Sequence, residues 1–208
     1  MTIRVIQIET GRMANFSYLV CAENAGRAVL VDPSWDMAKL EKHAAREKVA
    51  IEACLLTHGH YDHSMQLAPL LEKLGIKAHI DERDIFMLED LPQRLLAPLN
   101  SATKLELAGL TIEVVPTPGH SPGSVCYIMD GNIFTGDTLF TGACGRVDLP
   151  GSDPRAMTES LRRIATLDPA LVMWPGHAYG TVNSITLGAE TKTNPYIKFA
   201  LRGITPAE

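Results

Sequence analysis

The sequence has few cysteines, little positive charge and no long apolar run, and each shortage excludes a class of protein. Its four cysteines are spread out without a CxxC pair, so neither a zinc ribbon nor a disulfide framework is indicated. No stretch of about eighteen apolar residues is present, which argues against a membrane-spanning helix. Lys and Arg number 19 against 24 Asp and Glu, a net charge of −5. The chain therefore lacks the basic footprint of a nucleic-acid-binding protein.

The remaining composition is that of an ordinary globular protein. Apolar residues make up 46% and charged residues 21% of the chain, close to the globular average. A length of 208 residues suits one domain with a sizeable core. The first residues, MTIRVIQIET, lack the apolar core of a signal peptide. We therefore expect a single domain over residues 1–208 that is cytoplasmic and binds neither nucleic acid nor membranes; its oligomeric state cannot be read from the pattern.

Runs rich in β-branched and aromatic residues alternate with segments that carry apolar residues at helical spacing. Predicted strands cover residues 3–8, 15–22, 27–32, 51–57, 77–80, 111–115, 124–129, 132–135 and 171–174. Predicted helical segments cover residues 36–47, 64–74, 81–89 and 153–166, and residues 92–100 are predicted to be a loop. This order predicts an α/β protein with two sheets packed face to face and helices outside.

The segment THGHYDH at residues 57–63 directly follows a predicted strand and dominates the sequence. Three of the seven histidines fall within it, with an aspartate between them, a clustering with a low risk of arising by chance. Imidazole and carboxylate groups are ligands that suit zinc and ferrous iron. His58 and His60 are spaced to reach one ion, whereas Asp62 and His63 project differently and suit a neighbouring ion.

Further candidate ligands follow later strands. His120 lies in the segment TPGHSPG, Asp137 in FTGDT and His177 in WPGH. Each comes after a β-type run and a glycine, which places it on a loop at one edge of the sheets, where catalytic groups usually lie. The sequence therefore predicts a metal site that both halves of the chain assemble.

The motifs HGHYDH, PGH, TGD and PGH, in this order, resemble the metallo-β-lactamase superfamily. The resemblance implies a four-layer αββα sandwich, in agreement with the predicted order of elements. It also implies two ligand sets that share a bridging residue. His58, His60 and His120 would bind a first ion, Asp62, His63 and His177 a second, and Asp137 would bridge the two ions.

Two smaller motifs resemble the glyoxalase II (hydroxyacylglutathione hydrolase) branch of this superfamily. They are GRVD at residues 145–148 and TNPY at residues 193–196. Glyoxalase II carries an additional carboxy-terminal helical domain that binds glutathione, and the sequence after His177 is too short for that domain. The resemblance is therefore to a short, glyoxalase II-like branch.

This resemblance implies a metal-dependent hydrolase of thioesters or small esters. Two divalent ions, zinc in the first place and iron or manganese as alternatives, would hold a bridging hydroxide that attacks the acyl carbonyl. Asp62 would be the catalytic residue that orients this hydroxide. Because a thiolate leaves readily, the reaction needs no strong general acid. A small-molecule thioester or ester is the expected partner.

Other activities of the same superfamily also fit the motifs. In a persulfide dioxygenase, a single ferrous ion would be bound by His58, His120 and Asp137, leaving positions open for oxygen and a sulfur substrate. A lactonase would need only a different pocket. A protein that binds metal without turnover is the non-catalytic alternative, and resemblance in fold does not choose among these.

Three residues close to the motifs are considered for other roles. Arg146 either anchors a substrate carboxylate, for which guanidinium is the preferred partner, or pairs with Asp148. Tyr179 either donates a hydrogen bond to a reacting oxygen or lines the cleft. Cys144 is expected to be structural, because no feature of the sequence indicates a lowered thiol pKa.

Overall fold

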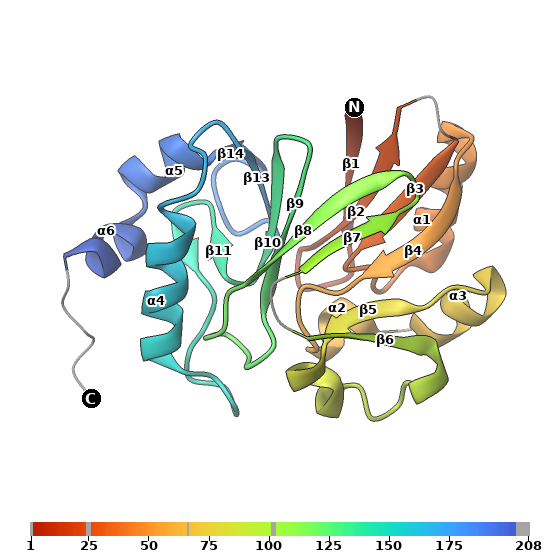
Figure 1. Ribbon diagram of the computed structural model, residues 1–208, viewed down its shortest axis with the longest axis horizontal. Coiled ribbons are helices and arrows are strands. Elements are labelled where there is room, and N and C mark those ends of the chain that lie inside the picture. Colours follow the sequence, from red (N-terminus) through yellow and green to blue (C-terminus); the bar gives the residue numbers. More distant parts are fainter. Residues whose placement is uncertain (1, 24–25, 66, 101–102, 203–208) are drawn as a thin grey trace.

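The first half of the chain forms a mixed six-stranded sheet in the computed structural model, which describes residues 2–23, 26–65, 67–100 and 103–202 (Figure 1). In spatial order its strands are β1 (Ile3–Thr10), β2 (Asn15–Ala22), β3 (Arg27–Val31), β4 (Ala50–Leu55), β5 (Ala78–Asp81) and β6 (Leu96–Leu99). The first three strands are antiparallel neighbours, whereas β3 to β6 run parallel. Parallel strands bring their carboxyl ends to the same edge.

The second half forms another six-stranded sheet. In spatial order its strands are β14 (Ile185–Thr186), β13 (Val172–Pro175), β10 (Asn132–Gly136), β9 (Val125–Met129), β8 (Leu110–Pro116) and β7 (Thr103–Leu107). β10 and β13 are parallel and the other neighbours antiparallel. A separate hairpin consists of β11 (Leu139–Phe140) and β12 (Ala143–Cys144). The strands β8, β10 and β13 therefore all end at one edge.

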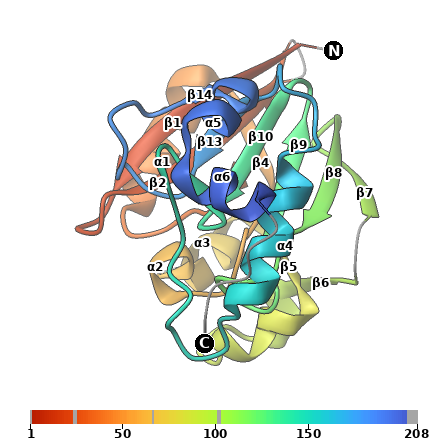
Figure 2. The ribbon, with the colours of Figure 1, turned by 90° about the vertical axis from the view of Figure 1, so that its left-hand side faces the viewer.

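Helices cover the outer face of each sheet (Figures 1 and 2). On the first sheet they are α1 (Met37–Glu47), α3 (Leu67–Leu74) and the 3₁₀ helices η1 (Glu82–Met87) and η2 (Gln93–Leu95). On the second sheet they are α4 (Pro154–Ile164), α5 (Leu187–Thr193) and α6 (Pro195–Leu201). A one-turn helix, α2 (Tyr61–Ser64), follows β4. The result is the predicted four-layer αββα sandwich; none of the described helices has the length and apolarity to cross a membrane.

Alternation along the strands builds the apolar layers of this sandwich. On β2, Phe16, Tyr18 and Val20 pack in the cluster between the two sheets, whereas Leu19 and Cys21 pack in the cluster beneath α1. Because both faces are covered, every residue of β2 is buried. A one-residue shift in register would exchange the two sets, so the core also fixes where β2 begins.

Capping residues fix where the helices begin. Asp36 accepts a hydrogen bond from the amide of Lys39 at the start of α1. Asp153 caps α4 directly before a proline, and Asn194 caps α6 in the same way. Such caps contribute about 1 kcal/mol each, and proline is favoured at the first helical position. Local sequence therefore determines where α1, α4 and α6 begin.

The two sheets are hydrogen-bonded to each other at one edge. The amide of Phe16 donates to the carbonyl of Gly176 over 2.8 Å, and the amide of Ala178 donates to the carbonyl of Ala14 over 2.8 Å. This short antiparallel bridge pairs residue 15 with residue 177. The amino end of β2 is thereby fixed against the segment that follows β13.

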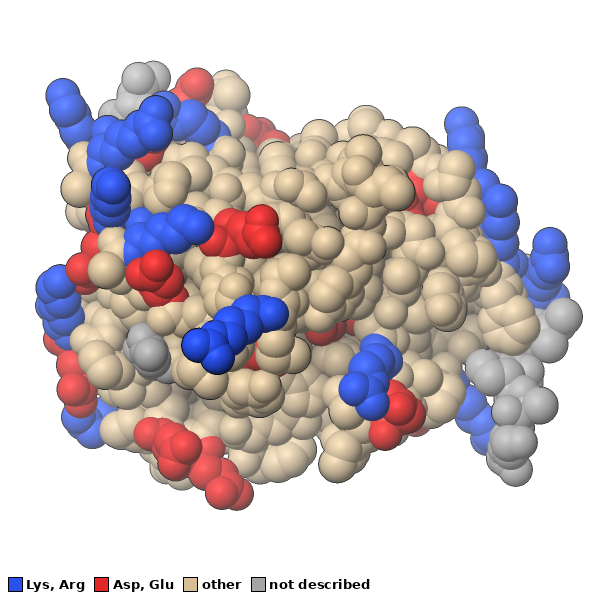
Figure 3. All heavy atoms as spheres, turned by 180° about the vertical axis from the view of Figure 1, so that it is seen from behind, with Lys and Arg blue, Asp and Glu red and all other residues tan. Residues whose placement is uncertain are grey.

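Charged side chains do not separate by sign on the face that Figure 3 shows. Basic and acidic side chains lie beside one another toward the edges, and most of the middle is uncharged.

Several element predictions were wrong. Residues 92–100 contain η2 and the strand β6, which tolerates Pro98 because it lies at the edge of its sheet. Within the predicted helix over residues 81–89, residues 82–87 form the 3₁₀ helix η1. Within the predicted helix over residues 64–74, residues 67–74 form α3 and Ser64 is the last residue of α2; residue 66 lies outside the described residues. β7, α5 and α6 were not predicted. Short or edge elements carry too few residues for a clear period.

Candidate metal centre

All seven predicted ligands lie at one edge of the sandwich, between the two sheets. His58 follows β4, His120 follows β8, Asp137 follows β10 and His177 follows β13. These four strands end at the same edge, which is where ligands bind in open α/β sheets. The remaining candidates are on or directly before α2, within a few residues of β4. The structure therefore brings together residues that are up to 119 positions apart in the chain, from His58 to His177.

The first ligand set consists of the imidazoles of His58, His60 and His120. One nitrogen from each lies within 4.8 Å of the others. His60 Nδ1 is 2.9 Å from His120 Nε2. His58 is 1% exposed, and its Nε2 has no hydrogen-bond partner. Three ring nitrogens thus converge on one point.

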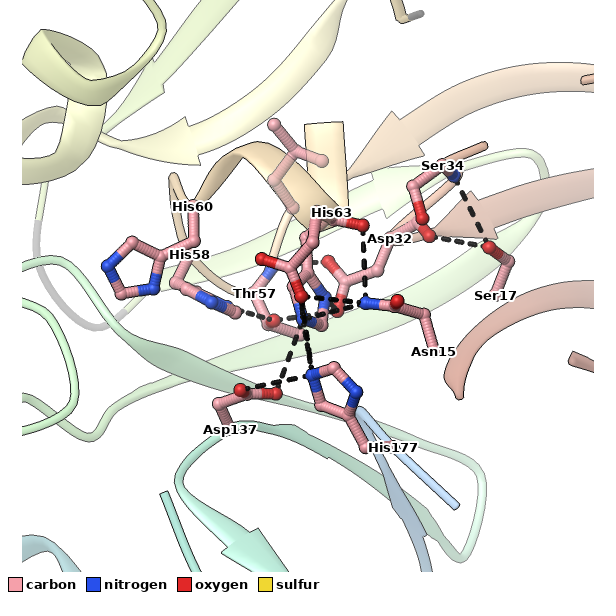
Figure 4. A network of polar contacts seen from close by, with 12 residues as sticks. Asn15, Ser17, Asp32, Ser34, Thr57, His58, His60, His63, Asp137 and His177 are labelled. Atoms are coloured by element: carbon pink, nitrogen blue, oxygen red, sulfur yellow. Dashed lines mark hydrogen bonds and ion pairs between the residues drawn. The ribbon is translucent and has the colours of Figure 1, made fainter. Parts of the chain in front are cut away.

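The second ligand set consists of Asp62, His63 and His177, whose ligand atoms also lie within 4.8 Å of one another. His63 Nε2 is 3.2 Å from His177 Nε2. The Oδ2 atom of Asp62 is 3.5 Å from His63 Nε2 and 3.4 Å from His177 Nε2. Figure 4 shows these two histidine side chains directed toward each other. All three residues are buried.

Asp137 lies between the two ligand sets. Its Oδ1 atom is 3.3 Å from His63 Nε2, and its Oδ2 atom is 3.5 Å from His120 Nε2 and 3.3 Å from His177 Nε2. One carboxylate therefore contacts a member of the first set and two members of the second. This position fits the bridging role that the sequence resemblance implies for Asp137.

The side chains of both sets fit divalent cations. Pairs of imidazole nitrogens face each other at hydrogen-bond distance, and the unpartnered Nε2 of His58 is a buried polar atom of the kind that an ion satisfies. Burial and the nearby His63 lower the pKa of His58 well below its usual range, so its ring is neutral and keeps its lone pair. Mixed imidazole and carboxylate ligands are those that zinc, iron and manganese accept.

The pKa shifts of His63 and Asp137 indicate that a cation would be stabilised at the second set. Burial opposes a charge on His63, but the carboxylates of Asp137 and Asp32 raise its pKa well above its usual range. Burial likewise opposes a charge on Asp137, but His63 and His177 lower its pKa well below its usual range. Several carboxylates are thus enclosed together, and a cation among them would compensate their charge.

Backbone carbonyls orient two of the ligand rings. His120 Nδ1 donates to the carbonyl of Arg146 over 2.9 Å, and His177 Nδ1 donates to the carbonyl of Met13 over 2.9 Å. A proton on Nδ1 leaves the Nε2 lone pair free, and in both rings Nε2 is the nitrogen that faces the other ligands.

Asp32 is a buried residue beside the second ligand set that was not predicted from the sequence. It is 1% exposed and accepts hydrogen bonds from the amide and the hydroxyl of Thr57, each over 2.7 Å. Its Oδ2 atom also lies 3.2 Å from His63 Nδ1, on the side of the ring away from the other ligands. The sequence signal for Asp32 is an acidic residue directly after a buried strand. It places Asp32 at the site because β3 lies parallel to β4 and both strands end there.

Asn15 was also missed, and it contacts Asp62. Its Nδ2 donates to Asp62 Oδ2 over 2.9 Å and to the Asp62 carbonyl over 3.2 Å. Its Oδ1 accepts from Trp35 Nε1 over 3.1 Å, which fixes the orientation of the amide. Asn15 is fully buried and lies beside Asp32 and His63 in Figure 4.

The residues considered for substrate contact lie at the rim of the site. Arg146 forms a two-point pair with Asp148, with both distances 2.9 Å, and both side chains are 68% exposed. Tyr179 is 57% exposed and its ring stacks on the ring of His177, 4.5 Å away. Burial raises the pKa of Cys144 to about 11, which agrees with a structural thiol.

The chain can now be compared with known proteins. An αββα sandwich with ligand sets from both sheets at one edge defines a class of metalloprotein fold. Residues 10–177 match the family model "Metallo-beta-lactamase superfamily". The chain belongs to the metallo-β-lactamase superfamily. It is 32% identical over 200 residues to the "Probable polyketide biosynthesis zinc-dependent hydrolase BaeB" of Bacillus velezensis, covering 95% of this chain and 88% of that protein.

Two further similarities cover most of the chain. The hydroxyacylglutathione hydrolase GloC of Haemophilus influenzae is 30% identical over 188 residues, which are 82% of this chain and 87% of that protein. The crystal structure of TTHA1623 in a di-iron-bound form superimposes with a TM-score of 0.80 at 33% identity, covering 92% of this chain and 100% of that chain. The predicted membership of a superfamily that includes glyoxalase II is confirmed.

Proposed function

We propose that this protein is a binuclear metal-dependent hydrolase that cleaves thioesters or small esters. The observation that carries the proposal is the pair of three-residue ligand sets with Asp137 between them. Each set would hold one ion, and a pair of ions held by neighbouring ligand sets suits hydrolysis. The likeness to a hydroxyacylglutathione hydrolase favours a thioester, and the likeness to a zinc-dependent hydrolase favours zinc.

When bound, such a pair of ions lowers the pKa of water to about 7 and polarises an acyl carbonyl. Asp62 accepts a hydrogen bond from the attacking water and so orients it toward the carbonyl carbon. Asn15 donates to Asp62 Oδ2 and holds the carboxylate in this orientation. The amide of Asn15 is in turn fixed by Trp35. A thiolate is a good leaving group, so no protein side chain has to protonate it.

The exposed rim residues would bind the rest of the substrate. Burial and the nearby carboxylates of Asp137 and Asp62 raise the pKa of Tyr179, so its hydroxyl is protonated at neutral pH and can donate a hydrogen bond. Arg146 is anchored through its carbonyl, while its guanidinium is at the surface and, among the residues that the structure describes, pairs with the equally exposed Asp148 alone. A substrate carboxylate can replace that partner, because guanidinium binds carboxylates in a two-point geometry.

The test combines elemental analysis with a rate. Protein purified without added metal would be assayed for metal content and for hydrolysis of a glutathione thioester, with chelator-treated protein as the control. We expect about two ions per chain and turnover above the metal-free control. Metal-loaded protein that hydrolyses neither thioesters nor small esters would refute the proposal.

The same sample also tests a different chemistry. A single iron per chain, together with oxygen consumption on glutathione persulfide, would identify a dioxygenase in which His58, His120 and Asp137 bind the metal. Hydrolysis of lactones in preference to thioesters would keep the binuclear centre and change the substrate class.

A further inference from the structure

Asp84 is a buried carboxylate that belongs to none of the metal-binding motifs. It lies in η1, is 0% exposed and accepts three hydrogen bonds. Its Oδ2 atom accepts from the Gly59 amide over 2.9 Å and from the Ser121 hydroxyl over 2.6 Å. Its Oδ1 atom accepts from the Gly123 amide over 2.6 Å. All three donors are uncharged groups on two other loops.

These two loops carry the whole first ligand set. Gly59 lies between His58 and His60, and Ser121 directly follows His120. One side chain of the first sheet therefore connects a loop of its own sheet with a loop of the second sheet. None of its hydrogen bonds reaches a residue of the second ligand set.

The contact is close on both sides of Asp84. A Cβ atom added to Gly59 would lie 2.7 Å from the Asp84 carbonyl oxygen, and one added to Gly123 would lie 2.7 Å from Asp84 Cγ. Contacts this short do not occur for real Cβ atoms, so both positions require glycine. The two loops are thus held against Asp84 with no space between them.

We infer that Asp84 is a positioning residue for the first metal ion: it sets the separation of the His58–His60 loop and the His120 loop. A carboxylate suits this role because it only accepts hydrogen bonds, and it can accept several at once. Hydrogen bonds to a charged acceptor are also shorter and stronger than neutral ones. This inference rests on the proposed binuclear centre and is independent of the substrate.

The first test replaces one oxygen acceptor with a donor. In Asp84→Asn, the side-chain NH₂ group faces at least one of the three groups that donate to Asp84. Two donors cannot form a hydrogen bond with each other, so we expect the two loops to move apart. We expect the affinity for one zinc ion to fall about 10- to 100-fold, the range seen when partners of metal ligands are removed. We expect the affinity for the other ion to change less than about 2-fold. Competition with a chelator would measure both affinities.

The matched control is Asp81→Asn. Asp81 is 2% exposed and lies at the start of the same turn, but its hydrogen bonds go to Arg83. If weakening this turn were enough to release an ion, both variants would lose it, and the assigned role of Asp84 would be wrong. Ser121→Ala removes one of the three contacts and should lower the same affinity by a smaller factor, which gives a second reading should Asp84→Asn fail to fold.

Paired variants identify which ion is affected. In a His177→Ala background, where the first set remains intact, Asp84→Asn should weaken the remaining ion. In a His120→Ala background, the same substitution should leave the remaining ion unchanged. The opposite pattern, or equal losses in both backgrounds, would overturn the inference. Wild-type protein that binds only one ion would instead refute the binuclear centre of the proposed function.

Discussion

The two ligand sets differ in charge and in what supports them. The first set has three imidazoles, supported by the Arg146 carbonyl and by hydrogen bonds from both of its loops to Asp84. The second set contains the carboxylate of Asp62, with Asn15 and Asp32 behind it. Neutral ligands fix the position of an ion, whereas an added carboxylate also attracts the ion and can orient water. In the proposed mechanism, the first set would bind the substrate carbonyl and the second would prepare the nucleophile.

Removal of both ions should have the largest effect and should also show whether the two sets differ. Treatment with a chelator should lower activity at least about 1,000-fold, because metal ions contribute several kcal/mol to stabilisation of the transition state. At a free metal concentration 100 times the Kd of a site, binding at that site also adds about 2.7 kcal/mol to the free energy of unfolding. Zinc added back stepwise, followed by calorimetry, should bind in two unequal steps. Two equal steps would contradict the difference between the sets.

Substitution of Asp62 tests the role that only the second set supplies. Asp62→Asn should lower kcat about 100- to 10,000-fold, because it removes the group that orients the attacking water. Metal content must be measured on the same sample, since the variant also weakens one ligand. Asp168→Asn, on the exposed turn before β13, is the control and should keep full activity. A zinc-loaded Asp62→Asn variant with undiminished kcat would remove Asp62 from the chemistry.

Asp32 should act on the second set as Asp84 acts on the first. Asp32→Asn keeps the size of the side chain but loses the negative charge beside His63. We expect a loss of about 10- to 100-fold in affinity for one ion, and that ion should be the one that Asp84→Asn leaves in place. The double variant should then lose both ions. If both single variants release the same ion, the two sets do not have separate supports.

The ligands themselves could be predicted from the sequence, whereas their supports could not. Every ligand lies in a short motif directly after a strand, so its position is encoded locally. The groups that contact the side chains of Asp32 and Asp84 lie 25 or more residues away in the chain, and those that contact the side chain of Asn15 lie 20 or more away. These contacts depend on which strands are neighbours, and strand order is not contained in the hydrophobic pattern. A buried acid in a strand end or turn is a signal only once its neighbours are known.

The fold shows the same limit. The long, periodic segments that became α1, α4 and β2 were predicted correctly, because each has a clear apolar spacing. The edge strand β6 lies within residues 92–100, which were predicted to be a loop. Its four residues form a strand because β5 offers a partner. Pairing with β5 therefore outweighed the local preference of residues 96–99 for a loop.

Substitution of Arg146 should have a smaller effect, confined to binding. Arg146→Gln removes the charge but keeps the backbone carbonyl that receives the His120 hydrogen bond. We expect KM for an acidic thioester to rise about 10-fold with kcat nearly unchanged, because the substitution removes one charge-assisted contact that solvent already weakens. Arg94→Gln, on an exposed pair with Glu72, is the control. A drop in kcat without a change in KM would place Arg146 in the chemistry instead.

Cys144 should show the smallest effect, although its loop lies next to the first set. With a thiol pKa of about 11, roughly one molecule in a thousand carries the reactive thiolate at pH 8. Alkylation by iodoacetamide should therefore be slow at pH 8 and accelerate up to about pH 11. Cys144→Ser should retain activity within about 2-fold. Rapid alkylation at neutral pH that abolishes turnover would contradict a structural thiol.

The bridge between residues 15 and 177 affects how the protein can open. The amides of Phe16 and Ala178 bond across the two sheets at the rim of the site. For the sheets to slide or part at this edge, both bonds have to break together. The bridge therefore opposes a hinge motion between the two halves at this edge. These two amide protons should accordingly be among the slowest to exchange with deuterated solvent, and their exchange reports separation of the halves.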